Sequence, residues 1–275
     1  MGSLSPSINW EVGDPTLNVQ EEMVMRSFGW LGPGLFDQRD IGFSYHKKAA
    51  VGDFPLVEEP MVKDLIIGPI ADQSKLGSCG AFASTGNMVA TDQENTGDPK
   101  NLSQLWLYYR YREMFGHVEY DDGVFLRDLI KVLFSDGVCL EDDWPYVLAN
   151  WNKKPPSDTY TEAKKNCITS YHALYSVNEM IQCIASGYTF FGGIYCYESI
   201  DSPYTEKTGR IEIPKTGEKL VGGHALLFSK YDKHKQLFGG PNSWGVEWGD
   251  RGKFTIPFEY LASSRLAADF WTIRV

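Results

Sequence analysis

Residues 71–82 read Ala71-Asp72-Gln73-Ser74-Lys75-Leu76-Gly77-Ser78-Cys79-Gly80-Ala81-Phe82, and mostly small or apolar side chains continue to Ala90. Such a run predicts a helix that is buried on more than one side, with Cys79 in its first turn. A helix N-terminus carries roughly half a positive charge, which favours a thiolate over a thiol. The segment therefore predicts a central helix and a reactive cysteine at its start.

Two later segments carry the groups that a reactive cysteine needs, Gly222-Gly223-His224-Ala225 and Asn242-Ser243-Trp244-Gly245. A thiol that attacks a carbonyl requires a base, a group that orients the base, and donors for the oxyanion. His224 can act as the base and Asn242 can orient it. Gln73 and the backbone N–H of Cys79 can supply the donors, so the three segments together predict nucleophilic catalysis.

These segments resemble the active-site segments of papain-like cysteine peptidases. His224 lies within the family's spacing of roughly 130–150 residues after the cysteine, and Asn242 lies somewhat beyond it. Two positions depart from the family pattern, since Leu76 replaces a disulfide cysteine and Gly80 replaces an aromatic residue. The resemblance to the bacterial and viral branch runs from about residue 28 to the C-terminus, through Gly29-Trp30-Leu31-Gly32-Pro33, Asp37-Gln38-Arg39-Asp40 and Pro257-Phe258-Glu259-Tyr260-Leu261.

The hydrophobic pattern predicts helices first and strands later, which favours an α+β fold with a cleft between two parts. We expect a loop that extends to about residue 165. The resemblance implies a papain-like two-lobe fold, with a helical left lobe that carries the nucleophile and a β-barrel-like right lobe that carries His224 and Asn242. We expect an N-terminal arm over 1–60, the left lobe over 61–178 and the right lobe over 179–275. The expected elements are helices over 104–115, 124–135 and about 177–186, and strands over 190–197, 222–230, 237–238 and 252–256.

The resemblance also implies an activity, hydrolysis of peptide or protein substrates by a cysteine endopeptidase through an acyl-enzyme. In the family, a tryptophan at the position of Trp244 shields the bond between the histidine and the asparagine from water. Two alternatives stay open, an acyl-transferring or deamidating relative and an inactive protein that holds peptides in its cleft. The positions expected to bind substrate are Gly77, Gly123, Gly223 and Trp244.

Composition excludes several other classes of function. The formal net charge is −10 and no basic stripe is present, so we expect no nucleic-acid partner. The chain has five cysteines without a disulfide spacing, which indicates free thiols. No spacing of His, Cys and Asp suggests a metal site, and we expect no cofactor. We interpret four cysteines as packing residues, Cys139, Cys167, Cys183 and Cys196.

The N-terminal arm lacks the pattern of a secretory signal, and no run approaches the roughly 18 apolar residues of a membrane helix. We therefore expect a cytoplasmic protein with no membrane association, and the oligomeric state stays open. Trp30, Leu35 and Phe36 are too apolar to remain in water without a surface to cover. The arm is thus either a permanent strap on the two lobes or a gate that crosses the cleft and restrains substrate entry.

Overall fold

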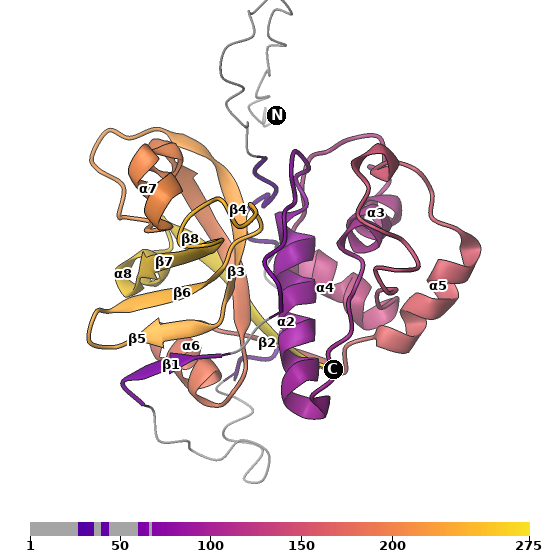
Figure 1. Cartoon of the computed structure of the whole chain (residues 1–275), viewed down its shortest axis with the longest axis horizontal. Helices are drawn as coiled ribbons and strands as arrows, with labels where there is room; N and C mark the ends of the chain where they lie inside the picture. Colours follow the sequence, from indigo (N-terminus) through magenta and orange to yellow (C-terminus); the bar gives the residue numbers. More distant parts are fainter. Residues whose placement is uncertain (1–26, 36–39, 44–59, 66–67) are drawn as a thin grey trace, which may run out of the picture.

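The computed structural model describes residues 27–35, 40–43, 60–65 and 68–275, which form a helical lobe and a strand-rich lobe. Figure 1 shows the strands on the left, the helices α3 to α5 on the right, and helix α2 (Cys79–Thr96) between them. Helix α2 contacts α3 and α4 on one side and strands β3, β4 and β8 on the other. The predicted α+β fold with two lobes is confirmed.

The helical lobe contains α3 (Gln104–Phe115), α4 (Leu126–Ser135) and α5 (Ser157–Ala163). Helix α3 begins where predicted, because the Ser103 hydroxyl accepts a hydrogen bond from the Trp106 backbone N–H. It ends at Gly116, which adopts the left-handed conformation at φ 75°. Helix α5 lies within the predicted loop, and that prediction was wrong for these residues. The helix is too short for a clear period, and it is anchored by the Trp106 indole N–H, which donates to Thr159 Oγ1 over 2.9 Å.

The strand-rich lobe contains two four-stranded antiparallel sheets. One has the order β2-β8-β3-β4 and the other β1-β5-β6-β7. The predicted barrel-like lobe is thus a pair of sheets, and these described strands do not close into one barrel. The strands are β1 (Val62–Asp64), β2 (Ser170–Ala173), β3 (Phe190–Tyr197), β4 (Leu220–Phe228), β5 (Lys230–Asp232), β6 (Leu237–Pro241), β7 (Lys253–Pro257) and β8 (Ala267–Arg274). Helices α6 (Val177–Ala185), α7 (Pro203–Thr208) and α8 (Phe258–Ala262) accompany them, and 3₁₀ turns lie at Leu148–Asn150, Lys164–Asn166 and Glu198–Asp201.

Each lobe has its own hydrophobic core. The helical core surrounds α2 and includes Trp106 and Tyr108, both almost fully buried. The second core lies between the sheets, where Phe190 stacks on Phe228 with ring centroids 4.6 Å apart. The core around α2 also includes Phe191, Leu227 and Trp271 from the strands, so residues of both lobes pack together around this helix.

The predicted boundaries of the arm and lobes, after residues 60 and 178, stay predictions. Strands β1 and β2 precede residue 178, and they pair with β5 and β8. Among the helices that the structure describes, none combines the length and the apolar character that crossing a membrane requires.

Candidate active site

Cys79 is the first residue of α2 and is fully buried where the lobes meet. The backbone N–H of Ala225, on β4, donates to Cys79 Sγ over 3.3 Å, which places the strand segment that carries His224 against the start of α2. The packing around Gly80 leaves no room for the aromatic residue of the family pattern, because a Cβ at this position would lie 2.4 Å from Val124 and 3.0 Å from Leu126. These two side chains fill the space behind the nucleophile, so the start of α2 is packed without the ring.

His224 and Asn242 are also buried, and His224 Nε2 lies 2.8 Å from Asn242 Oδ1. Oδ1 also accepts from the Ser243 backbone N–H over 2.8 Å, so this amide atom is the oxygen. The shared proton therefore belongs to Nε2 of the imidazole. The Trp244 ring stacks on His224 at 4.4 Å, where it covers the pair. The structure thus brings Trp244 to the position expected of a shield.

Gln73 lies beside these residues with its side chain completely buried. Its Oε1 accepts from the Ser243 hydroxyl over 2.6 Å, so the amide nitrogen is turned the other way. That nitrogen, Nε2, donates to the carbonyls of Ser27 at 3.0 Å and Leu76 at 2.8 Å. Gln73 therefore presents a donor to a backbone carbonyl oxygen inside the site.

Asp121 binds the loop that precedes Cys79. No sequence pattern predicts this role. Its Oδ1 accepts from the Gly77 backbone N–H over 2.9 Å and from the Tyr108 hydroxyl over 2.5 Å. The same Tyr108 hydroxyl accepts from the Gly123 N–H over 3.3 Å. Gly123 needs its glycine, because its φ is 85° and a Cβ would lie 2.3 Å from the carbonyl oxygen of Gly29.

Tyr146 is a second residue that sequence reasoning missed, because no motif surrounds it and its partners lie about 70 residues earlier in the chain. Its hydroxyl donates to the Gln73 carbonyl over 2.9 Å and contacts the Ser78 hydroxyl at 2.7 Å. Its ring packs edge-on against Phe82. Tyr146 thereby contacts both ends of the loop between Gln73 and Ser78.

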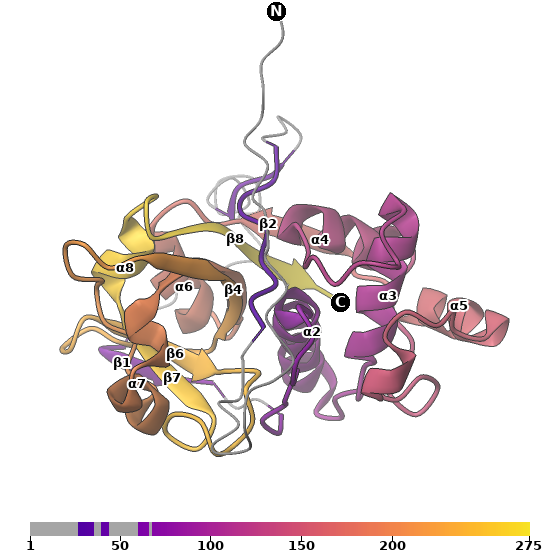
Figure 2. The same cartoon turned by 90° about the horizontal axis from the view of Figure 1, so that it is seen from above.

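Residues 27–31, which we call the strap, run through the cleft between the lobes. In Figure 2 this indigo segment passes between the strands and the helices, above α2. The Trp30 N–H donates to the Gly223 carbonyl over 2.8 Å. Val124 N–H donates to the Gly29 carbonyl, and Leu31 N–H to the Val124 carbonyl, which forms a parallel bridge. The strap is therefore bound through its backbone to both walls of the cleft.

The strap also covers the reactive groups. The Ser27 carbonyl occupies Gln73 Nε2, and the Phe28 ring meets His224 edge-on at 6.5 Å. Gly29 comes so close that a Cβ would lie 1.9 Å from the carbonyl oxygen of Gly77. A peptide and the strap cannot occupy this space together. Of the two interpretations of the arm, the structure places residues 27–31 across the cleft, and residues 1–26 and Phe36 lie outside the described part. The expectation that Leu35 covers a surface was wrong, because this side chain is 91% exposed.

Burial raises the pKa of the Cys79 thiol to about 11, although hydrogen bonds from the backbone of Ala225 and Gly29 lower it. Burial of Sγ thus opposes the thiolate that a helix N-terminus favours. The helix N-terminus and the donors do not offset the loss of water around Sγ. Removal of the strap would return water to the thiol.

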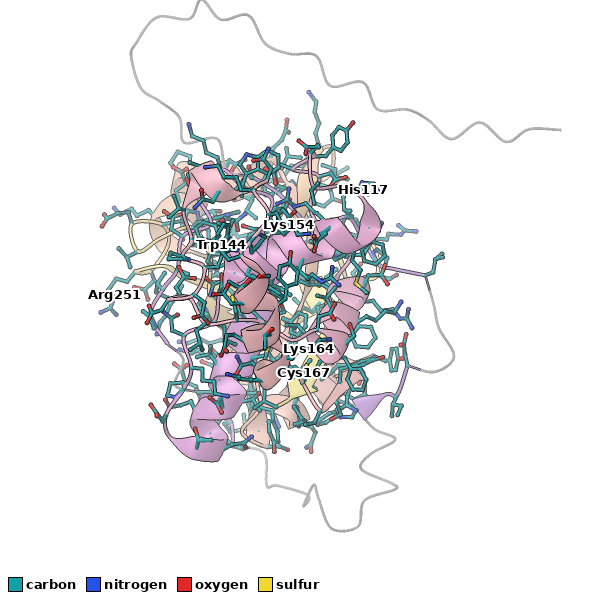
Figure 3. The ribbon with its side chains drawn as sticks, turned by 90° about the vertical axis from the view of Figure 1, so that its right-hand side faces the viewer. His117, Trp144, Lys154, Lys164, Cys167 and Arg251 are labelled. Carbon is teal, nitrogen blue, oxygen red and sulfur yellow. The ribbon has the colours of Figure 1, made fainter. Side chains whose placement is uncertain are left out.

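Of the other cysteines, Cys196 lies on β3 close enough to Cys79 and the His224 backbone to interact with both. All five cysteines are free, as the sequence predicted. Figure 3 shows the outer face of the helical lobe with His117 and Cys167 on it, and Cys167 lines a pocket with Met88 and Asp92 in the C-terminal half of α2, away from Cys79. His117 lies 3.1 Å from Asp122 at the surface. His46 is outside the described residues, and within those residues no group of His, Cys, Asp and Glu is arranged to hold a metal ion.

Comparisons with known proteins agree with this geometry. The profile described as papain family cysteine protease matches residues 59–264. An uncharacterised peptidase C1-like protein of Acanthamoeba polyphaga mimivirus is 30% identical, over 91% of this chain and 88% of its own. The crystal structure of xylellain, a cysteine protease from Xylella fastidiosa, superposes with a TM-score of 0.81 at 31% identity, over 94% of this chain and 99% of the other.

More distant relatives share the fold. Bromelain protease from Ananas comosus superposes with a TM-score of 0.62 at 18% identity, over 78% of this chain and 99% of its own. Oryzain gamma chain from Oryza sativa is 24% identical over 70% of this chain, which spans about half of that protein, 53%.

Proposed function

This chain belongs to the papain family of cysteine proteases and is a cysteine peptidase, and we propose that Cys79 is its nucleophile and His224 its proton carrier. One observation carries the assignment. A peptide carbonyl, that of Ser27, accepts a hydrogen bond from Gln73 Nε2 beside the buried thiol. Gln73 Nε2 thus already donates to a backbone carbonyl oxygen, as it would donate to the oxyanion of a substrate carbonyl.

In the proposed reaction, Cys79 gives its proton to His224 and attacks the scissile carbonyl. Gln73 Nε2 and the backbone N–H of Cys79 donate to the oxyanion that forms. The imidazolium then protonates the departing amine, and a carbon–sulfur acyl-enzyme remains. Water, deprotonated by His224, attacks this acyl-enzyme and releases the acid together with the thiol.

Asn242 keeps the imidazole in the tautomer that this sequence requires. Because Asn242 Oδ1 accepts from Nε2, the proton exchanged with Cys79 is carried by Nδ1. Trp244 stacks on the ring and keeps water from the His224–Asn242 bond. Asn242 and Trp244 act through His224, and we assign them as positioning residues.

The glycines have a steric role in substrate binding. A Cβ at Gly223 would lie 2.3 Å from the Trp30 carbonyl oxygen, so only glycine admits a peptide backbone there. The Gly223 carbonyl would accept from a substrate N–H as it now accepts from Trp30. Gly77 and Gly123 let the backbone of the bound chain pass close to the oxyanion loop, and Val124 supplies the main-chain hydrogen bonds.

The strap makes the form described here a closed one. Its backbone uses the Gln73 donor and the Gly223 acceptor that a substrate needs, so substrate binding requires its displacement. The gate interpretation of the arm follows from this overlap. Hydrolysis then depends on how often residues 27–31 leave the cleft.

The experiment that tests the function uses the purified full chain and an epoxide inhibitor of cysteine peptidases. We expect one adduct on Cys79, none on the Cys79→Ala variant, and hydrolysis of peptide amides that the inhibitor abolishes. Product masses separate the alternatives, because an acyl-transferring enzyme joins an added amine to the acyl fragment and a deamidating enzyme changes Gln to Glu. Turnover that survives in Cys79→Ala would contradict the proposal.

A further inference from the structure

The Trp30 side chain of the strap fills a pocket in the strand-rich lobe. Only 4% of this residue is exposed, and its ring lies against Tyr195 with centroids 4.9 Å apart. A Cβ at Gly193, on β3, would lie 2.0 Å from the Trp30 ring, and one at Gly223 would lie 3.0 Å from it. Two glycines on neighbouring strands thus leave a hollow for a large side chain, which we call the Trp30 pocket.

The Trp30 pocket has a carboxylate at its base. Asp269 Oδ2 lies 3.5 Å from the Trp30 indole nitrogen, at the long end of hydrogen-bond distance. Asp269 Oδ1 accepts from the Trp271 indole N–H over 2.6 Å. Asp269 has a φ of 67°, a left-handed conformation that Asp and Asn adopt more readily than most non-glycine residues. Its two carboxylate oxygens face the indoles of Trp30 and Trp271, so the carboxylate lies against the side chain that fills the pocket.

This carboxylate lacks an ion-pair partner among the residues that the structure describes. Burial raises the pKa of Asp269 to about 6, although the two indoles and Arg127 favour its charged form. Arg127 is engaged elsewhere, because its Nε and Nη2 donate to Asp40 over 2.6 and 2.8 Å. Asp128 adds a further negative charge nearby. The Trp30 pocket therefore presents a buried carboxylate to whatever side chain fills it.

The pocket also lies on a defined side of the thiol. Phe28 covers His224 and Trp244, where the departing amine would receive its proton. Trp30 lies two residues further along the strap, where its backbone bridges to Val124 and its ring packs against Tyr195 and Gly193. The Trp30 pocket therefore faces the acyl part of a substrate, which precedes the scissile bond.

We propose that the Trp30 pocket binds an arginine side chain of the substrate through Asp269. The pocket prefers arginine to lysine, and it prefers both to apolar or acidic side chains. The inference rests on the proposed peptidase function. A guanidinium in the pocket would stack on Tyr195 and donate a hydrogen bond to Asp269 Oδ2. The Trp30 indole N–H now lies too far from this oxygen for a short hydrogen bond. It would also neutralise a buried carboxylate that has no salt bridge to the described residues. An apolar side chain would fill the hollow and leave Oδ2 without a donor.

The test uses the full chain with Trp30→Ala, which vacates the pocket, and peptidyl-coumarin amides with Arg, Leu or Glu as the second residue before the cut. We expect kcat/KM for the Arg substrate to exceed that for the Leu substrate at least tenfold. It should exceed that for the Glu substrate by a larger factor. Adding Asp269→Asn should remove most of the Arg-to-Leu ratio. Asn tolerates φ above zero and can still accept from Trp271, so this variant keeps the local fold. Glu259→Gln, an exposed residue on α8, is the charge-matched control and should keep the ratio.

A binding measurement separates this proposal from the proposed function. Peptides with Arg or Leu at the same position are titrated into two proteins that cannot cleave them, Cys79→Ala with Trp30→Ala, and the same pair with Asp269→Asn added. If the Arg peptide binds more tightly and this preference depends on Asp269, the pocket proposal is supported. If the Trp30→Ala protein that keeps Cys79 nevertheless cleaves no peptide, the peptidase mechanism is contradicted while the pocket proposal stands. Equal or tighter binding of the Leu peptide, or an Arg preference that persists in Asp269→Asn, would overturn the pocket proposal.

Discussion

Ser243 Oγ donates a 2.6 Å hydrogen bond to Gln73 Oε1, and this bond decides which end of the Gln73 amide faces the cleft. Both side chains are buried, so a reversed amide would put a nitrogen against the hydroxyl and an oxygen against the carbonyls of Ser27 and Leu76. The backbone reinforces the pair, because the Gln73 N–H donates to the Ser243 carbonyl over 2.8 Å. Ser243 thus links Gln73, the proposed oxyanion donor, to the segment that carries Asn242.

We predict that Ser243→Ala lowers kcat about tenfold and changes KM little, because the amide loses its preferred orientation. Gln73→Ala should cost more, about 10²–10³ in kcat, the usual effect of losing one oxyanion donor. In the double variant, Ser243→Ala should add nothing to Gln73→Ala if Ser243 acts only through that amide. Steady-state kinetics of the four proteins measures this, and additive losses would argue for a separate role of Ser243.

We predict that Cys79→Ala abolishes peptide hydrolysis and leaves the fold intact, because alanine fits the fully buried space of the thiol. His224→Ala should be comparably damaging. Asn242→Ala should cost less, because an orienting residue shifts the populations of the imidazole and supplies no reacting atom. Circular dichroism checks the fold and initial rates check the order. A larger loss in Asn242→Ala than in His224→Ala would refute the assigned roles.

The residues proposed for catalysis could be predicted because each lies in a short segment whose neighbours also match. Gln73 and Cys79 share one segment, and His224 and Asn242 head two others. The helix 104–115 and the strand 190–197 could be predicted too, since a cap and a run of apolar residues mark their ends. These signals are local, so a single sequence contains them.

Residues whose roles depend on distant segments could not be predicted. Asp269 stands in an ordinary strand sequence, and only the approach of Trp30 makes its carboxylate part of a pocket. Asp121 looks like a turn residue until its contacts with Gly77 and Tyr108 are known. The short strand β1 pairs with β5 far along the chain, which no local pattern announces.

We predict that alkylation of Cys79 in the full chain keeps accelerating as the pH rises from about 7 to about 10. Burial raises the pKa of this thiol to about 11, so the thiolate is a minor form over this range and grows with pH. Iodoacetamide labelling with peptide mapping measures the rate at Cys79, with the partly exposed Cys167 as the reference thiol. A rate at Cys79 that is already constant at neutral pH would mean a resting thiolate and contradict the prediction.

We predict that Asp269→Asn stabilises the protein more at a pH of about 7.5 than at about 4. Burial raises the pKa of Asp269 from 3.8 to about 6, so the folded state binds this proton more tightly than the unfolded state. The contribution of Asp269 to stability is therefore lost as the pH rises through this window, by up to about 3 kcal/mol. Denaturant unfolding of both proteins at the two pH values measures the difference. Glu259→Gln is the control, and a pH-independent effect of Asp269→Asn would rule out the titration.

The strap offers the sharpest test of autoinhibition, because Gly29 passes the oxyanion loop with no room for a side chain. A Cβ on Gly29 would lie 1.9 Å from the Gly77 carbonyl oxygen, and both groups are backbone. One of the two segments must move when this Cβ is added. The Gly77 loop is held by Asp121 and Tyr146, whereas the strap near Gly29 is held by main-chain bonds to the cleft and by the rings of Phe28 and Trp30.

We therefore predict that Gly29→Ala displaces the strap and raises kcat/KM for small peptides, by about tenfold or more if the closed form dominates. The alkylation rate of Cys79 at neutral pH should rise with it, because water returns to the thiol and its pKa falls. Gly34→Ala is the matched control, since its Cβ would meet Arg127 at an ordinary 3.5 Å and should change neither rate. A fall in kcat/KM for Gly29→Ala would mean that the oxyanion loop moves instead of the strap, and the strap would then not be what limits substrate entry.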